Sequence, residues 1–312
     1  TRFIALEVAA RGVGHIAHLC RIAPPRIGVV LNVGSAHMGE FGGRAAIVRA
    51  KGELVEALPP AEQGGVAVLN ADDDAVIGMA ARTPARVLSY GLAESADVRA
   101  VEVDLDEQGR PRFTLAIGGA TAPVRLRLVG VHQVHNALAV AAVLHELGRD
   151  VADIAAALGE AGPVSRWRME VTERPDGVTI VNDAYNANPE SMSAALRTLA
   201  TLAASRRSFA VLGHMAELGP THRSEHERVG RLAAESGVDV LVTVGEQAAG
   251  IADGAASVAD WTGQTVAVAD VAEAVAVLRE RLRPKDIVML KGSRVAGLEQ
   301  VAEQLIGVEA AE

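Results

Sequence analysis

Short apolar segments of strand length alternate with helical patterns along most of the chain, and this alternation limits the possible folds more than any other feature of the sequence. In the first half, expected strands at residues 3–8, 27–33 and 66–69 are separated by expected helices at 16–19 and 44–58. Alternation of this kind is typical of βαβ units around a parallel sheet. The sequence therefore predicts an α/β protein.

Between residues 87 and 128 the pattern changes to short alternating stretches separated by glycine-rich turns. Such alternation is typical of half-buried antiparallel strands, so we expect a small antiparallel subsheet here. Further on, apolar strands and helices alternate again, which predicts a second doubly wound α/β unit. Gly162-Pro163 is a natural hinge, so the expected domains are residues 1–161 and 162–312.

The composition narrows the class of protein. A chain of 312 residues with 49% hydrophobic residues can bury a sizeable core, and a formal net charge of −9 argues against a nucleic-acid-binding surface. Cys20 is the single cysteine, so no intrachain disulfide can form and we expect a cytoplasmic protein. Because no apolar run approaches the roughly 20 residues that span a bilayer, we expect no membrane insertion.

The start of the chain has its own implication. It begins with Thr1 rather than Met, inside an expected strand, and the sequence contains no Gly-x-x-x-x-Gly-Lys-Ser/Thr phosphate loop. We therefore expect a fragment of a longer protein, with further sequence upstream.

Residues 183–192, Asp-Ala-Tyr-Asn-Ala-Asn-Pro-Glu-Ser-Met, follow a β-branched strand at 178–181 and precede an apolar helical pattern. Pro189 suits the first turn of a helix, so the string is interpreted as a strand end, a polar loop and a helix start. Loops at the carboxyl ends of parallel strands form the ligand crevice of doubly wound sheets. The string is therefore a candidate binding site, and the alternative is an asparagine-rich turn that only caps the helix.

This string closely resembles the C-terminal signature of the Mur ligase family, in particular of the branch that joins D-alanyl-D-alanine to UDP-N-acetylmuramoyl-tripeptide. The resemblance extends along nearly all of the chain, and the order and spacing of its pieces make coincidence a poor explanation. The other matching pieces are Glu7 with residues 10–12, residues 32–37 with 41–42, residues 50–54, His132 with residues 136–139, Arg168, residues 215–219 and residues 291–294.

The resemblance implies a fold and an activity. The fold is the remainder of a central ATPase domain, with a parallel sheet and a small antiparallel subsheet, followed by a Rossmann-like C-terminal domain. The activity is an ATP- and Mg²⁺-dependent ligase that forms an acyl phosphate on the substrate carboxylate and then an amide with the dipeptide. We expect a monomer, and we expect the fragment alone to be inactive because it lacks the phosphate loop.

A metal site is expected near Glu7 and His37, which lie at the ends of neighbouring expected strands. A buried carboxylate is costly unless paired or bound to metal, and oxygen ligands with one imidazole suit Mg²⁺. The alternative for His37 is a structural role in a turn, and for Lys51 it is a solvated helix lysine that pairs with Glu53 or Glu56. The resemblance implies instead that Lys51 is carbamylated and helps to hold the second Mg²⁺.

Nucleotide contacts are expected from the start of a helix near residue 134. His132 and Asn136 enter this helix from a turn, and the Asn136 amide could hydrogen-bond an adenine edge, whereas a helix cap is the alternative. The family has Asn directly after the His, but this chain has Gln133.

In the expected second domain, the resemblance implies that Arg168 reaches the ATP phosphates and that Asp183 lies near the ribose. Arg166 competes for the phosphate role, and Lys291 is also expected to meet phosphate. His214 replaces the aspartate that the family usually has there. The expected catalytic residues are Lys51, Arg168 and His37.

Tyr185, Asn186 and Asn188 are expected to face the nucleotide or the incoming dipeptide. Two other readings of the whole chain stay open. Another ligase of the superfamily, such as a folylpolyglutamate synthase, is disfavoured by the string from Tyr185 to Pro189. A non-catalytic nucleotide-binding or scaffold protein is favoured by the missing phosphate loop.

Overall fold

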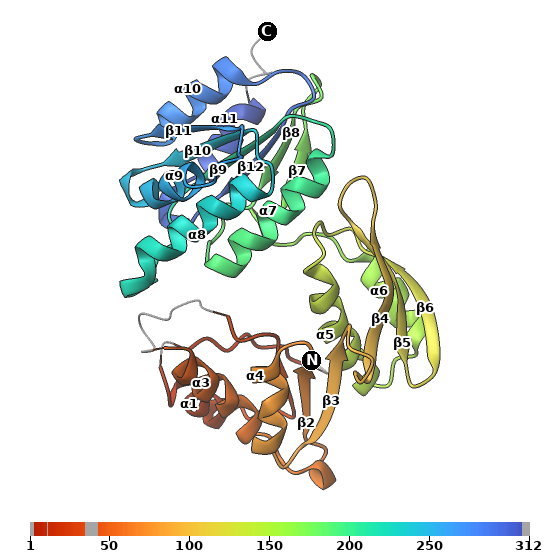
Figure 1. Cartoon of the computed structure of the whole chain (residues 1–312). Coiled ribbons are helices and arrows are strands. Elements are labelled where there is room, and N and C mark those ends of the chain that lie inside the picture. Colours follow the sequence, from red (N-terminus) through yellow and green to blue (C-terminus); the bar gives the residue numbers. More distant parts are fainter. Residues whose placement is uncertain (1–2, 11, 35–42, 308–312) are drawn as a thin grey trace. The chain divides into compact units, whose positions relative to one another are not determined.

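The computed structural model describes residues 3–10, 12–34 and 43–307 (Figure 1). The chain divides into two compact units, which are described separately. Unit 1 comprises Thr1–Asp104, Pro111–Arg127 and His132–Ala161, and unit 2 comprises Leu105–Arg110, Leu128–Val131 and Gly162–Glu312.

Unit 1 is built on a six-stranded sheet whose strands lie side by side in chain order. These strands are β1 (Ile27–Val30), β2 (Val66–Asn70), β3 (Arg86–Gly91), β4 (Val98–Leu105), β5 (Pro111–Ile117) and β6 (Ala120–Arg125). Strands β1 to β4 are parallel, whereas β5 and β6 pair in antiparallel fashion. The expected antiparallel segment therefore extends the parallel sheet rather than forming a separate layer.

Helices cover both faces of this sheet (Figure 1). They are α1 (His15–Ile22), α3 (Arg44–Glu56), α4 (Asp74–Ile77), α5 (Gln133–Glu146) and α6 (Val151–Glu160), with short 3₁₀ turns η1 (Ala61–Gln63) and η2 (Gly78–Arg82). In β2, Val66 and Val68 pack in the core formed with α5 and α6. The alternate residues Ala67 and Leu69 pack with α3 and α4. All five residues of β2 are buried because successive side chains point to opposite, covered faces.

Unit 2 contains a second six-stranded sheet, in the order β11-β10-β9-β12-β8-β7. Its strands are β7 (Glu170–Glu173), β8 (Thr179–Asn182), β9 (Ser208–Leu212), β10 (Val240–Val244), β11 (Gln264–Val268) and β12 (Ile287–Lys291). Only the β7–β8 pair among the described strands of this sheet is antiparallel. The carboxyl ends of β8, β9 and β12 consequently meet at one edge of the sheet.

The helices of unit 2 lie on both faces of its sheet. They are α7 (Pro189–Ala203), α8 (His222–Glu235), α9 (Ala249–Ala256), α10 (Val271–Arg281) and α11 (Glu299–Ile306), with 3₁₀ turns η3 (Gly219–Thr221), η4 (Glu246–Ala248) and η5 (Arg294–Ala296). In β12, Met289 packs in the core with α7 and α8, whereas Val288 and Leu290 pack with α10 and α11. The predicted doubly wound α/β architecture is confirmed.

Residues 3–10 form neither helix nor strand, so the expected strand at 3–8 is wrong. Phe3, Ile4 and Leu6 are 61%, 77% and 63% exposed. In the described sheet β1 is an edge strand, and residues 3–10 do not pair with it. An apolar run becomes a strand only where a neighbouring strand supplies partners for its backbone N–H and C=O groups, and local sequence does not reveal that partner.

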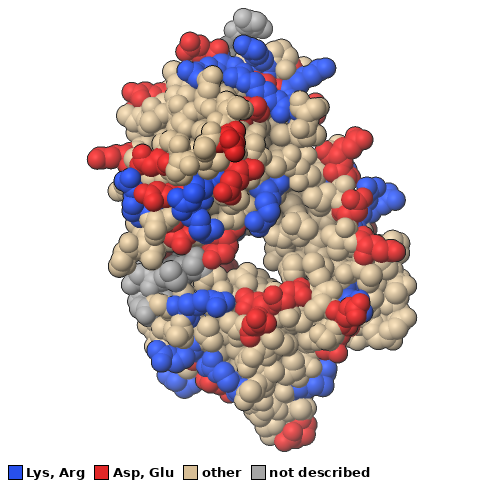
Figure 2. Space-filling model, in the orientation of Figure 1, with Lys and Arg blue, Asp and Glu red and all other residues tan. Residues whose placement is uncertain are grey.

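Acidic and basic side chains are interspersed over both units on the face shown in Figure 2. No helix in the described part of the chain is long and apolar enough to cross a lipid bilayer.

Candidate functional site

In unit 1, the segment that follows β1 is held by side chains from two other elements. The Lys51 ammonium on α3 donates to the backbone oxygen of Asn32 at 2.6 Å. The Asp73 carboxylate accepts from the backbone N–H of the next residue, Val33, at 2.8 Å. Burial lowers the pKa of the Lys51 amine, and the nearby Asp73 carboxylate opposes this effect. Lys51 is therefore a half-buried amine that loses its proton more readily than a solvated lysine does.

The two glutamates considered as partners of Lys51 have other roles. Glu53 is 7% exposed, and its carboxylate accepts two backbone N–H groups at the start of α1 at 2.5 and 3.0 Å. Glu56 forms an ion pair with Arg82 at 2.8 Å. The interpretation of Lys51 as a lysine paired with Glu53 or Glu56 is therefore wrong. Sequence reasoning also missed Glu53 as a buried helix cap.

Of the other residues expected at a metal site, the structure describes only Glu7. Glu7 is exposed on the irregular segment 3–10, and His37 lies outside the described residues. No group of three or more His, Cys, Asp or Glu side chains among the described residues is arranged to hold a metal ion. A metal site formed with Lys51 therefore stays a prediction.

At the start of α5, Gln133 links the two residues expected near adenine. The Gln133 side-chain oxygen accepts from the Asn136 amide at 3.0 Å, and Gln133 Nε2 lies 3.2 Å from His132 Nε2. His132 occupies the N-cap position without a side-chain capping bond, so the cap interpretation is wrong for His132. One turn away, His135 Nε2 lies 2.9 Å from the Asp72 carboxylate, a pair that sequence reasoning missed.

In unit 2, Arg168 stands between two non-glycine residues in the left-handed backbone region, Trp167 (φ +59°) and Met169 (φ +52°). Such conformations cost about 1–3 kcal/mol each and persist only where surrounding contacts enforce them. The Tyr185 N–H donates to the Trp167 backbone oxygen at 3.1 Å, and the Met169 N–H donates to the Asp183 carboxylate at 3.1 Å. The loop after β8 thus fixes the backbone on both sides of Arg168.

Lys291, at the end of β12, holds the same loop from the other side. Its side chain is 3% exposed, and its ammonium donates to the Asp183 carboxylate at 2.6 Å and to the backbone oxygen of Asn186 at 2.9 Å. A buried ammonium requires compensation of this kind. The geometry supports a role for Lys291 in holding the loop, while a Lys291–phosphate contact and an Asp183–ribose contact stay predictions.

Two further arginines at this edge are paired with carboxylates. Arg294 lies over the Trp167 ring at 4.1 Å and pairs with Glu299 at 2.7 Å. Arg166 pairs with Glu303 at 3.3 Å. Sequence reasoning missed both contacts of Arg294, and no local pattern connects Arg294 to Trp167, which lies far away in the chain.

Arg168 differs from these arginines. Its guanidinium carbon lies 4.1 Å from the centre of the Tyr185 ring, and no carboxylate among the described residues lies within ion-pair distance of it. Arg168 is also exposed. Of the two arginines proposed to contact phosphate, Arg168 therefore has the charge available for an anion, whereas Arg166 is already paired.

The asparagines of the loop after β8 have partly structural roles. The Asn188 side-chain oxygen accepts from the Ser191 N–H at 2.8 Å, and the Ser191 hydroxyl accepts from the Asn188 N–H at 3.0 Å, which completes a capping box. The Asn186 side-chain oxygen accepts from the Ala187 N–H at 2.8 Å. Asn188 therefore caps α7, and a contact of this turn with a ligand stays a prediction.

A histidine cluster supports the loop that follows β9. His226 is fully buried, its Nε2 accepts from the Met215 N–H at 2.9 Å, and its Nδ1 donates to the His222 backbone oxygen at 2.7 Å. Burial lowers the pKa of His226 to about 4. Nearby, His214 Nε2 lies 3.2 Å from the Ser293 hydroxyl, and burial also lowers the pKa of His214. Both rings therefore favour the neutral form.

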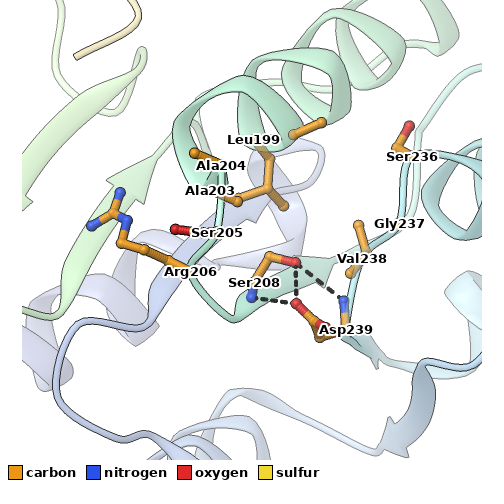
Figure 3. A pocket seen from close by; sticks show the side chains of 11 residues that line it. Leu199, Ala203, Ala204, Ser205, Arg206, Ser208, Ser236, Gly237, Val238 and Asp239 are labelled. Atoms are coloured by element: carbon orange, nitrogen blue, oxygen red, sulfur yellow. Dashed lines mark hydrogen bonds between the residues drawn. The ribbon is translucent and has the colours of Figure 1, made fainter. Parts of the chain in front are cut away.

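A surface hollow of about 260 Å³ lies at the starts of β9 and β10 (Figure 3). There the Asp239 carboxylate accepts from the N–H and hydroxyl of Ser208 at 2.7 and 2.9 Å. The polar groups of Ser208 and Asp239 thus hydrogen-bond to each other at the amino ends of the strands. The candidate ligand residues lie at the opposite, carboxyl ends, so this hollow is not the candidate site.

The fold places this chain among proteins with two consecutive α/β units. Each unit presents polar side chains at the carboxyl ends of its parallel strands, where such sheets bind ligands. The model of the Mur ligase middle domain matches residues 1–144, and that of the Mur ligase glutamate ligase domain matches residues 167–294. The chain belongs to the Mur ligase family.

Individual relatives extend over both units. The UDP-N-acetylmuramoyl-tripeptide–D-alanyl-D-alanine ligase of Mycobacterium bovis is 50% identical, with 98% of this chain and 63% of the relative covered. The Escherichia coli ligase of the same name is 30% identical, with 97% and 65% covered. This chain thus spans somewhat less than two thirds of the length of these relatives.

Solved structures of Mur ligases also superpose on both units. MurF from Acinetobacter baumannii superposes with a TM-score of 0.84 at 31% identity, covering 95% of this chain and 63% of that chain. MurF ligase from Thermotoga maritima in complex with ADP superposes with a TM-score of 0.81 at 29% identity, covering 95% and 65%.

Proposed function

We propose that this chain is part of an ATP-dependent ligase that joins D-alanyl-D-alanine to UDP-N-acetylmuramoyl-tripeptide. The observation that carries the proposal is the 50% identity to a relative of that name over 98% of the chain, through both units. The relative described in complex with ADP supports ATP as the nucleotide. We further propose that residues 1–161 are the ATP-binding domain, that residues 162–312 are the C-terminal ligase domain, and that the enzyme is a cytoplasmic monomer.

In the proposed reaction, an oxygen of the tripeptide carboxylate attacks the γ-phosphorus of ATP, and ADP leaves. The dipeptide amine then attacks the acyl carbon, the C–N bond forms as the bond to phosphate breaks, and the nitrogen loses a proton. The negative charge on the phosphoryl oxygens must be stabilised during the reaction. A fixed cation stabilises this charge best when no carboxylate already neutralises the cation. Arg168, which lies against the Tyr185 ring and has no carboxylate partner among the described residues, supports this role.

For Lys51 we propose a carbamate, formed when the neutral amine nitrogen bonds to the carbon of carbon dioxide and releases a proton. The lowered pKa of the half-buried Lys51 amine supports this chemistry, because a neutral amine is the reactive form. A guanidinium could not take its place, since it does not lose its proton in proteins. With Glu7 and His37, a carbamate would give the oxygen and imidazole donors that suit Mg²⁺, and the metal would neutralise phosphate charge when bound.

Local geometry also supports the predicted contacts with adenine and with the dipeptide. Exposed Asn136, oriented by Gln133, supports an adenine contact together with His132. Tyr185, Asn186 and Asn188 belong to the loop beside Arg168, which supports a contact of this loop with nucleotide or dipeptide.

The alternatives make different predictions. A folylpolyglutamate synthase would consume glutamate rather than D-alanyl-D-alanine. A non-catalytic member would bind nucleotide without turnover. The names of the relatives with 30% to 50% identity favour the D-alanyl-D-alanine ligase.

The test is phosphate release by the purified full-length protein with ATP, Mg²⁺, UDP-N-acetylmuramoyl-tripeptide and D-alanyl-D-alanine. Release should require both substrates, and Arg168→Ala should lower kcat/KM by about 100-fold or more. The matched variant Arg166→Ala should change it by less than about tenfold, because exposed ion pairs contribute little. Release that depends on glutamate instead, or no release in wild type, would refute the proposal.

A further inference from the structure

Arg168 differs from the other cations at the carboxyl edge of the unit 2 sheet because an aromatic ring contacts it and no carboxylate of the described residues pairs with it. Lys291, Arg294 and Arg166 each pair with a carboxylate. A carboxylate partner fixes the direction of a cation but also cancels its charge. An aromatic face attracts a guanidinium through the ring quadrupole and leaves its net charge and hydrogen-bond donors available. Tyr185 supplies such a face to Arg168 at 4.1 Å.

Tyr185 acts on the backbone of this segment as well as on the side chain. Its N–H bonds to the Trp167 backbone oxygen at 3.1 Å, while Asp183, two residues earlier, accepts from the Met169 N–H at 3.1 Å. The left-handed residues on either side of Arg168 are thus enforced from the same short loop that provides the ring. One loop therefore sets both the origin and the direction of the Arg168 side chain.

We propose that Tyr185 is the positioning residue for Arg168, and that its ring holds the guanidinium ready for the terminal phosphate of the nucleotide. The proposal rests on the proposed function for the identity of the ligand. It assigns the role of Tyr185 to the ring face, so the hydroxyl is dispensable. Tyr185 is 41% exposed. A direct contact between Tyr185 and the dipeptide would instead require the hydroxyl or the exposed edge of the ring.

Substitutions at position 185 separate these roles. Tyr185→Phe keeps the ring face and loses only the hydroxyl, whereas Tyr185→Leu keeps an apolar side chain and loses the ring face. If the ring positions Arg168, Tyr185→Leu should weaken binding of a nonhydrolysable ATP analogue by about three- to twentyfold, the range expected for a lost cation–π contact. Tyr185→Phe should rescue the affinity to within about twofold of wild type.

The decisive measurement is a double-mutant cycle on the full-length protein, with dissociation constants for the ATP analogue and for AMP measured by calorimetry. In an Arg168→Ala background, Tyr185→Leu should have no further effect on analogue binding, because the two residues act as one unit. AMP, which lacks the terminal phosphates, should bind all variants alike. An equal loss in both backgrounds, or a loss in Tyr185→Phe as large as in Tyr185→Leu, would overturn the proposal.

A second readout does not depend on ligand or turnover. In the unliganded full-length protein, the NMR signal of the Arg168 Nε–H group should carry a ring-current shift in wild type and in Tyr185→Phe. That shift should disappear in Tyr185→Leu while the signal of Arg166 stays in place. Absence of the shift in folded wild type would refute the stacking itself. Failure of D-alanyl-D-alanine turnover would refute the proposed function but leave this measurement valid.

Discussion

Asp183 and Lys291 are 108 positions apart in the chain, and their charged groups meet at 2.6 Å in the interior of unit 2. The pair joins the ends of β8 and β12, and Asp183 also holds the backbone next to Arg168. The same carboxylate therefore compensates a buried cation and shapes the neighbouring loop.

Removal of Asp183 should destabilise the protein because it leaves the 3% exposed Lys291 ammonium without a counter-charge. We expect Asp183→Ala to lower the free energy of unfolding by about 3–5 kcal/mol in urea denaturation. Adding Lys291→Met should recover about 1–3 kcal/mol of that loss. The exposed pair of Arg112 and Asp104 is the control, and Arg112→Ala should cost less than about 1 kcal/mol. Additive losses at Asp183 and Lys291 would show that the pair is not coupled.

Lys51 should be indispensable for turnover if it carries a carbamate. In the full-length enzyme, Lys51→Ala should lose about 100-fold or more in kcat, and Lys51→Arg should not restore activity, because a guanidinium cannot be carbamylated. Added short-chain carboxylates should partly rescue Lys51→Ala. Lys285→Asn, at the exposed lysine of a turn, is the control and should keep its turnover. Near-normal turnover of Lys51→Arg would exclude the modification.

Gln133 should influence ATP binding through Asn136, to which it is hydrogen-bonded at 3.0 Å. Loss of an orienting hydrogen bond of about 1 kcal/mol should raise the KM for ATP about fivefold in Gln133→Ala, with little change in kcat. Gln108→Ala, at an exposed glutamine, should leave KM unchanged. Steady-state kinetics of the full-length protein would measure both. If KM is unchanged in Gln133→Ala, then Gln133 does not orient Asn136 toward adenine.

His226 should make stability depend on pH. Its pKa is about 4 when folded and near 6.5 when unfolded, because burial disfavours the charged ring. Between these values the unfolded chain binds a proton that the folded chain does not, so stability falls as the pH is lowered. We expect His226 to account for a loss of about 2 kcal/mol between pH 7 and pH 5.

The measurement is urea denaturation of wild type and His226→Gln at both pH values. Glutamine can still accept from the Met215 N–H but does not titrate. The variant should be less stable than wild type at pH 7, but its free energy of unfolding should fall less than that of wild type between pH 7 and pH 5. His214, whose pKa burial also lowers, adds a loss in the same direction in both proteins. Equal pH dependence in the two proteins would show that His226 is not the titrating group.

The periodicity of the sequence was sufficient for the α/β class because side chains buried on both sheet faces, as in β2 and β9, produce apolar runs of strand length. The start of α7 at Pro189 was equally predictable, since a capping box is encoded within four residues. The same local reasoning was wrong for residues 3–8, where strand formation depends on a partner that the apolar run does not specify.

The sequence by itself determined the alternation of elements, the capped start of α7 and the family motifs, all of which depend on residues close together in the chain. The tertiary structure decided which cations keep their charge. Lys291, Arg294 and Arg168 all belong to polar motifs, but carboxylates neutralise the first two while the Tyr185 ring holds the third. That difference could not be predicted locally, because Coulomb and aromatic contacts depend on distances in space that only the packed sheet establishes.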